Sequence, residues 1–383
     1  MKKTATIFML ILFTGTLFAQ EGPTWEGLKK QKAKSDAEIT NPKKSSNPKT
    51  WTKRAKLYYD ISTFVTGGLY KGMPAHGNGF QNAELMVGKP GKILQEGDYE
   101  VWVYNRKKLY FKNGALDHWE QTEFIDKDAL KKSAEALLKA VELDEKGTLK
   151  NKASFKDLNA LIKTAVINQA IEKYNSKDFD NAYNLMDYGY KLCNLPKNES
   201  DTAYNANQIQ YFEGVIAYKA KKYDAAKKHF EKSIKDGYQP GISYHYLADS
   251  YAASGDSAAF IAKVKEGFEK YPDEEQLIID LINYYMVRGE ADKAVEYIDL
   301  AIQKNPDNPS YYSAKATIFD NRTENILKEY ISYMDKAYEY KKEAFRNRNN
   351  PSLKAASLKK RDEALNKANK LMNLYLENLD KAE

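Results

Sequence analysis

The sequence predicts a mainly α-helical superhelical solenoid, with a small β-hairpin or meander insertion near the N-terminus and a long C-terminal capping helix. Three observations predict this fold. A 34-residue pattern occurs twice in succession between Gly241 and Asn308. Between Thr63 and Phe124 the helical spacing of apolar residues is replaced by the alternation of apolar and polar residues typical of strands, and glycine becomes frequent. Residues 352–383 then form one amphipathic segment.

Each copy of the 34-residue pattern has the residues that a packed helical hairpin needs. A small residue allows two helices to touch, an aromatic residue follows one turn later, and a glycine turn, a second small contact and a proline stop come after it. Period and landmarks resemble the tetratricopeptide repeat (TPR). The first copy has Leu247, Ala248, Tyr251, Gly255-Asp256, Gly267 and Pro272, and the second has Leu281, Ile282, Tyr285, Gly289-Glu290, Ala301 and Pro306.

Further copies extend the array in both directions. Gly214, Ala248, Ile282 and Ala316 recur at a constant spacing of 34 residues, so residues 151–325 are predicted to be the TPR array. Residues 20–63 and 126–150 are predicted to be the two halves of a first hairpin. The resemblance implies a curved stack whose inner face binds peptides or other proteins.

Residues 64–125 are predicted to fold as a β-rich module inserted between the two halves of that hairpin. Tyr99–Tyr104 and Lys108–Lys112 have strand-like alternation, and Asn113-Gly114 suits a type I′ turn before Ala115–Trp119. The alternative is a decorative hairpin that packs its large aromatic residues on the solenoid, namely Trp102, Tyr104, Phe111 and Trp119.

The inserted segment also resembles a family of small outer-membrane lipoproteins called SmpA/OmlA. Lys71-Gly72-Met73, the run Ala83-Glu84-Leu85 leading into Gly88-Lys89-Pro90, and the Trp102-to-Gly114 meander carry this resemblance. That family accompanies barrel assembly, so the likeness implies a place near the outer membrane. The segment lacks the lipid-bearing Cys of the family.

Beyond Asp320 the repeat pattern loses its register. We expect a turn at Asn321-Arg322-Thr323, where earlier copies have glycine, and a break between Asn347 and Pro351. Residues 326–383 are then predicted to be a helical cap, because a solenoid needs a terminal element with one polar face. A coiled-coil dimer seam is the alternative, and it has few heptads in its favour.

Residues 1–19 have the pattern of a secretory signal peptide, with Lys2 and Lys3 before an apolar run and Ala19 at its end. The run is shorter than the roughly 20 apolar residues of a membrane span. The sequence therefore predicts an exported protein, periplasmic or associated with the outer membrane. The formal charge of +7 comes from lysines interleaved with acidic residues, which is typical of a solvated face and gives no indication of nucleic-acid binding.

Residues that could carry catalysis do not form a recognisable set in the sequence. The four histidines are scattered, at positions 76, 118, 229 and 245, and no HExxH, CxxC, GxSxG or phosphate-loop motif occurs. Cys193, the single cysteine, is interpreted as a small buried residue of a helix. We therefore expect no enzyme activity, no cofactor and no metal site.

The candidate binding residues are those that the TPR register places on the inner face. They combine aromatic and polar side chains, and Tyr211, Tyr218, His245 and Asp249 are expected to form one patch. A protein or extended peptide of the cell envelope is the predicted partner; the alternatives are a carrier for small molecules or glycans, because aromatic faces also stack on sugar rings, and an uncharacterised enzyme. The full predicted set is Tyr174, Tyr211, Tyr218, Lys219, His245, Asp249, Asn283 and Met286.

Overall fold

The computed structural model describes residues 23–77 and 82–382. The predicted signal peptide, residues 1–19, lies outside the described residues. The chain divides into two compact units, residues 1–232 and 233–383. Within the part that the structure describes, no helix is both long and apolar enough to cross a membrane.

Unit 1 consists of helices and one small sheet. Asparagine side chains begin two of its helices: Asn41 and Asn47 each accept a hydrogen bond from the first turn, where a proline follows directly. The helices are α1 (Trp25–Thr40), α2 (Pro42–Ser45), α3 (Pro48–Thr63), α4 (Ala83–Val87), α5 (Ala129–Glu142), α6 (Ala153–Asn175), α7 (Phe179–Cys193), α8 (Ala206–Lys219) and most of α9 (Tyr223–Lys235).

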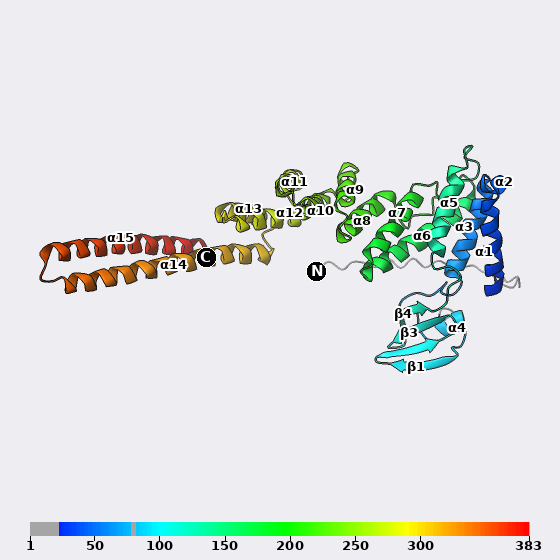
Figure 1. The fold of residues 1–383 in the computed structure, drawn as a ribbon, viewed down its shortest axis with the longest axis horizontal. Coiled ribbons are helices and arrows are strands. Elements are labelled where there is room, and N and C mark those ends of the chain that lie inside the picture. Colours follow the sequence, from blue (N-terminus) through cyan, green and yellow to red (C-terminus); the bar gives the residue numbers. More distant parts are fainter. Residues whose placement is uncertain (1–22, 78–81, 383) are drawn as a thin grey trace. The chain divides into compact units, whose positions relative to one another are not determined.

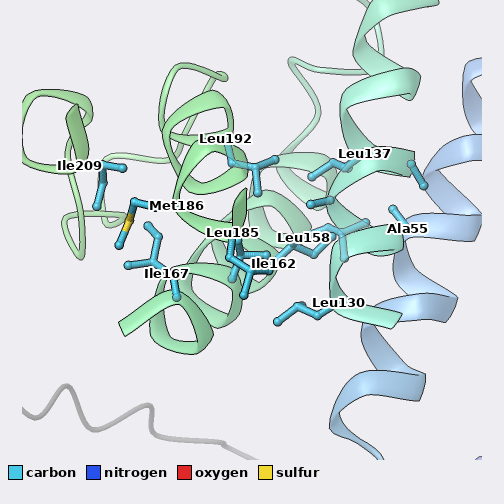
Figure 2. Close-up of a cluster of buried hydrophobic side chains, with 14 of the residues drawn as sticks. Ala55, Leu130, Leu137, Leu158, Ile162, Ile167, Leu185, Met186, Leu192 and Ile209 are labelled. Atoms are coloured by element: carbon cyan, nitrogen blue, oxygen red, sulfur yellow. The ribbon is translucent and has the colours of Figure 1, made fainter. Parts of the chain in front are cut away.

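Helices α3 and α5 pack against each other although more than 60 residues separate them in sequence. Ser133 lies at this contact, fully buried, and its hydroxyl donates a hydrogen bond to the carbonyl of Ala55 at 2.7 Å. A continuous apolar cluster then runs from α3 and α5 through α6 and α7 to α8, with Leu137, Ile162 and Ile209 among its members (Figure 2). This cluster is the layered core of a helical repeat stack.

Helix α1 precedes the first hairpin and was not anticipated from the sequence. Its lysine-rich sequence buries little beyond Trp25, Leu28 and Ser35, so it lacks a clear apolar stripe. Leu28 packs with Leu57, Tyr58 and Ile61 of α3, and polar contacts add to this attachment. The Arg54 guanidinium donates to the Ser35 hydroxyl at 3.0 Å and to the Asp36 carboxylate at 2.7 Å.

The inserted module is a four-stranded antiparallel sheet in the order β1-β2-β3-β4 (Figure 1). The strands are β1 (Lys92–Glu96), β2 (Tyr99–Val103), β3 (Lys107–Lys112) and β4 (Ala115–Gln121). Asn113 and Gly114 have φ of 52° and 74°, which confirms the predicted turn with two positive φ angles. Strand β1 was not predicted, because its side chains are mostly exposed on both faces.

The module has its own apolar core. Trp102 and Phe111 are buried in it, with ring centroids 4.6 Å apart, and they pack with Met73, Ala83 and Leu116. The alternative in which these aromatic residues pack on the solenoid is therefore wrong for Trp102 and Phe111. The physical reason is that α4 and the segment before it cover this face of the sheet.

Unit 2 begins with two successive hairpins at the predicted places and therefore confirms the helical repeat fold. Gly255 and Gly289 have φ of 87° and 73° and form the turns within the two hairpins. The helices are α10 (Pro240–Ala253), α11 (Ser257–Lys270), α12 (Glu275–Val287), α13 (Ala291–Lys304), α14 (Pro309–Arg346) and α15 (Pro351–Ala382).

Helix α14 corrects the prediction for the end of the array. It is continuous over 38 residues, so the expected turn at Asn321-Arg322-Thr323 is wrong, and the predicted boundary at residue 325 falls inside this helix. No glycine or proline occurs between Ser310 and Arg346, and asparagine, arginine and threonine weaken a helix without ending it. Helices α14 and α15 form a long antiparallel pair (Figure 1).

Candidate functional site

Four of the predicted inner-face residues lie on first helices of unit 1. Tyr174 is half-buried at the end of α6, with its ring 5.5 Å from that of Phe179. Tyr211 and Tyr218 are half-buried on α8, and the exposed Lys219 places its ammonium 5.7 Å from the ring of Tyr218. Each of these tyrosine side chains is therefore partly exposed to solvent and partly packed against neighbouring side chains.

Tyr211 and Tyr218 both pack on the second helix of their own hairpin, α9. The Tyr211 ring contacts that of Phe230 at 6.2 Å, and the Tyr218 ring contacts that of Tyr223 at 5.9 Å. Phe230 is fully buried in α9. Truncating either tyrosine therefore removes stabilising contacts as well as exposed surface.

The other four predicted residues lie in unit 2. His245 and Asp249 come from α10, whereas the exposed Asn283 and the half-buried Met286 come from α12. The structure brings His245 and Asp249 together within unit 2. The larger patch with the two unit 1 tyrosines stays a prediction.

His245 joins α10 to α12 through a residue that the sequence reasoning missed. Its Nδ1 lies 2.7 Å from Oδ2 of Asp280 on α12, and its Nε2 lies 3.6 Å from Oδ2 of Asp249. Burial by itself lowers the pKa of His245, but the hydrogen bond to Asp280 and the charges of Asp280, Asp249 and Glu274 outweigh it, so the pKa is raised. The imidazolium form is thus stabilised between two carboxylates.

Unit 1 has a cavity of about 540 Å³ that is lined by the inserted module and by helices α3, α5, α6 and α7. Volumes of about 300–1,000 Å³ are usual for ligand sites. Strand β4 of the inserted module contributes Trp119 and Gln121, and helices and loops contribute the rest of the wall. The helical and loop residues are Ser62, Thr66, Phe124, Lys127, Asp128, Lys131, Gln169, Glu172, Lys173, Asn181, Asn184, Leu185 and Tyr188.

The chemistry of this cavity is mixed, with amide, aromatic and basic side chains. Gln121, Gln169 and Asn184 offer both donors and acceptors. Trp119 and Tyr188 offer flat apolar faces, and the Tyr188 hydroxyl donates to Glu135 at 2.7 Å, which fixes its ring. No sequence motif indicates this cavity, because its residues come from the insertion, from loops and from helices α3, α5, α6 and α7, which only the fold brings together.

A second buried polar group lies between α7, α8 and α9. Burial raises the pKa of Glu213 to about 8 and lowers that of His229 to about 4, so both side chains are uncharged near neutral pH. Gln210 donates to Nδ1 of His229 at 2.6 Å, and Nε2 of the same ring lies 3.1 Å from the Tyr183 hydroxyl. This arrangement uses the neutral imidazole as a structural bridge.

Cys193 ends α7 and is half-buried, close to the interpretation from sequence. Burial raises the pKa of its thiol to about 11. The thiol is therefore protonated at neutral pH, which is the unreactive form.

Comparisons with known proteins concern the fold. No family model and no curated protein matches the chain. A TPR repeats protein from Bacteroides fragilis is similar at 18% identity and a TM-score of 0.28, over 56% of this chain and 91% of that one. YrrB, described as a TPR protein with an unusual peptide-binding site, is similar at 15% identity and 0.30, over 65% and 98%. Yeast Tom70 is similar at 16% identity and 0.28, over 67% and 60%.

Proposed function

We propose that this chain is an exported, non-enzymatic scaffold of the cell envelope that binds a protein or an extended peptide in a concave groove. The cavity of unit 1 carries the proposal. It lies where helices α6 and α7 meet the inserted module, so the module and the array form one concave surface.

The lining of the cavity suits a polypeptide. A peptide presents an N–H and a C=O at nearly every residue, and side-chain amides such as Gln169 and Asn184 can pair with both. Lys127, Lys131 and Lys173 also line the cavity, against Asp128 and Glu172. The excess of one positive charge favours a segment with acidic side chains or a terminal carboxylate.

Site-specific photocrosslinking tests the proposal. A benzophenone amino acid at Asn184, which is exposed and lines the cavity, is expected to form adducts with a polypeptide in envelope extracts. The same amino acid at Lys228, exposed on the second helix α9 and not part of the cavity, is the matched control. Polypeptide adducts of equal yield at both positions, or none at Asn184, would refute the proposal.

The two tyrosines of α8 provide the second test. The double variant Tyr211→Ala and Tyr218→Ala is expected to weaken capture of the crosslinked partner by about 2 kcal/mol or more if these rings are binding anchors. Because both rings also pack within their hairpin, thermal unfolding is measured in parallel. A fall in melting temperature with unchanged partner affinity would assign the rings to packing alone.

A glycan is the second candidate ligand, and the aromatic lining of the same cavity favours it. Trp119, Phe124 and Tyr188 could stack on sugar rings, with the amides bonding to hydroxyl groups. Binding to a glycan array, with no polypeptide adduct at Asn184, would support this function over the first.

The proposed location rests on the signal-like segment 1–19 and on the resemblance of the inserted module to outer-membrane lipoproteins. Fractionation of cells that express the full chain is expected to place it in the periplasm or with the outer membrane. A variant without residues 2–19 is the control and should stay in the cytoplasm. Retention of the full chain in the cytoplasm would overturn the proposed location.

A further inference from the structure

Three metal-binding side chains converge in unit 2 on the first helices of two successive hairpins. His245 and Asp249 come from α10 and Asp280 comes from α12. One ligand atom from each of the three lies within 4.8 Å of the other two. Their side chains are 13%, 29% and 12% exposed, so the cluster is sheltered from solvent yet open enough for an ion to enter.

The spacing of the donor atoms suits a small cation. Metal–nitrogen and metal–oxygen bonds of about 2.0–2.2 Å place neighbouring ligand atoms roughly 3–3.5 Å apart. The Nε2 of His245 and Oδ2 of Asp249 are 3.6 Å apart, close to that range. An ion takes one ring nitrogen, and Asp280 lies 2.7 Å from the other one, Nδ1. Coordination by all three residues therefore requires that this hydrogen bond be released and that the side chains turn towards one point, which is feasible because one ligand atom from each already lies within 4.8 Å of the others.

The charge of the cluster indicates the class of ion. With a neutral imidazole, the two carboxylates carry a charge of −2, which a divalent cation balances, whereas a proton on His245 leaves −1. An imidazole nitrogen among the donors favours a transition metal such as Zn²⁺ over Mg²⁺ or Ca²⁺, which prefer oxygen ligands alone.

We propose that His245, Asp249 and Asp280 form a binding site for a divalent transition-metal cation, which joins α10 to α12. Three protein ligands leave at least one coordination position for water or for an acidic group of a ligand. The site fixes the relative placement of two successive first helices. This inference is independent of the proposed function, because a cation would join the helices whether or not a peptide binds.

Calorimetric titration of the chelator-treated full chain with Zn²⁺ tests the site. We expect one cation per chain. His245→Asn, Asp249→Asn and Asp280→Asn should each weaken binding by at least about tenfold. His118→Gln is the matched control, because His118 forms a similar pair with Asp117 at 2.9 Å outside the cluster.

Two further measurements keep the proposal refutable if a variant folds poorly. Circular dichroism reports whether each variant keeps its helices, and Co²⁺ in place of Zn²⁺ gives a ligand-field absorption that changes when a nitrogen donor is lost. Absence of binding to the folded wild-type chain, equal affinity in the His245→Asn variant, or a preference for Ca²⁺ over Zn²⁺ would each overturn the proposal.

Discussion

Gly267 is the residue at which the packing of the repeats can be tested most directly. It lies on α11, and a Cβ atom added there would be 2.7 Å from Cβ of Tyr244, 2.9 Å from its Cγ and 3.0 Å from Cδ1 of Leu277. The first of these atoms is attached directly to the α10 backbone, so it cannot turn away. The substitution Gly267→Ala therefore requires α10 and α11 to move apart.

The expected cost follows from two opposing contributions. Overpacking of a close helix contact costs about 1–3 kcal/mol. Replacing glycine by alanine inside a helix, in contrast, stabilises it by about 1 kcal/mol, because alanine loses less backbone entropy. Because the added Cβ would lie 3.0 Å or less from three atoms, the overpacking cost is expected in the upper part of its range, about 2–3 kcal/mol, and the net loss is then roughly 1–2 kcal/mol. The sign itself is informative, because the same substitution at an open helical position would stabilise the protein.

Urea denaturation followed by circular dichroism measures this difference. Ala262→Gly, an exposed position on the same helix, calibrates the propensity contribution at about 1 kcal/mol. Gly267→Leu should cost more than Gly267→Ala, whereas Lys265→Leu, on the exposed side of α11, should cost much less. A Gly267→Ala variant that is as stable as the wild type, or more stable, would refute the close packing of α10 on α11.

Three further outcomes are expected. Asp201→Ala should cost about 3–5 kcal/mol in thermal unfolding, because it leaves the buried Lys163 ammonium without the carboxylate that lies 2.6 Å away. Glu213→Gln should stabilise the chain by at least about 1 kcal/mol near pH 9. Folding raises the pKa of this carboxyl from 4.5 to about 8, so the carboxyl costs no folding free energy at low pH, where it is protonated in both states. The cost grows as the pH rises from the unfolded towards the folded pKa, and glutamine removes it. Replacing residues 64–125 by a short Gly/Ser linker should leave the array helical, because loop length costs little free energy; loss of the helical signal would contradict a separate module.

The helical repeats were predictable because their contacts require particular residue types. Gly255 and Gly289 have positive φ, and Gly267 has no room for a side chain, so these positions leave a mark in the sequence. The same holds for Asn113-Gly114 in the inserted module. Where the backbone conformation or the packing tolerates only a few residue types, one sequence is enough to locate the helix or turn concerned.

Elements without such requirements were missed or misplaced. Helix α1 has no continuous apolar stripe, and it is held by the buried Leu28 together with the hydrogen bonds of Arg54. Helix α14 continues through Asn321–Thr323 because Ile318 and Ile326 are buried on either side of that segment, and this packing is a property of the folded chain. Weak local preferences do not decide such cases; tertiary contacts do.

The sequence places His245 and Asp249 one turn apart but does not identify Asp280 as a neighbour of His245, and the reason lies in how contacts cross from one repeat to the next. A 34-residue period places Ile279 in the position equivalent to His245, yet His245 bonds to Asp280, 35 residues away. Other polar pairs in unit 2 also fall near one period, with Lys304 and Asp273 separated by 31 residues and Asn308 and Glu275 by 33. Successive residues of a helix point in directions about 100° apart. The residue that faces a given side chain in the next repeat therefore need not be the one exactly 34 positions away. A search for polar residues separated by one period, plus or minus a few positions, would therefore find pairs such as His245 and Asp280. The unit 1 cavity could not be found in this way, because part of its wall comes from the insertion, which lies outside the 34-residue repeat.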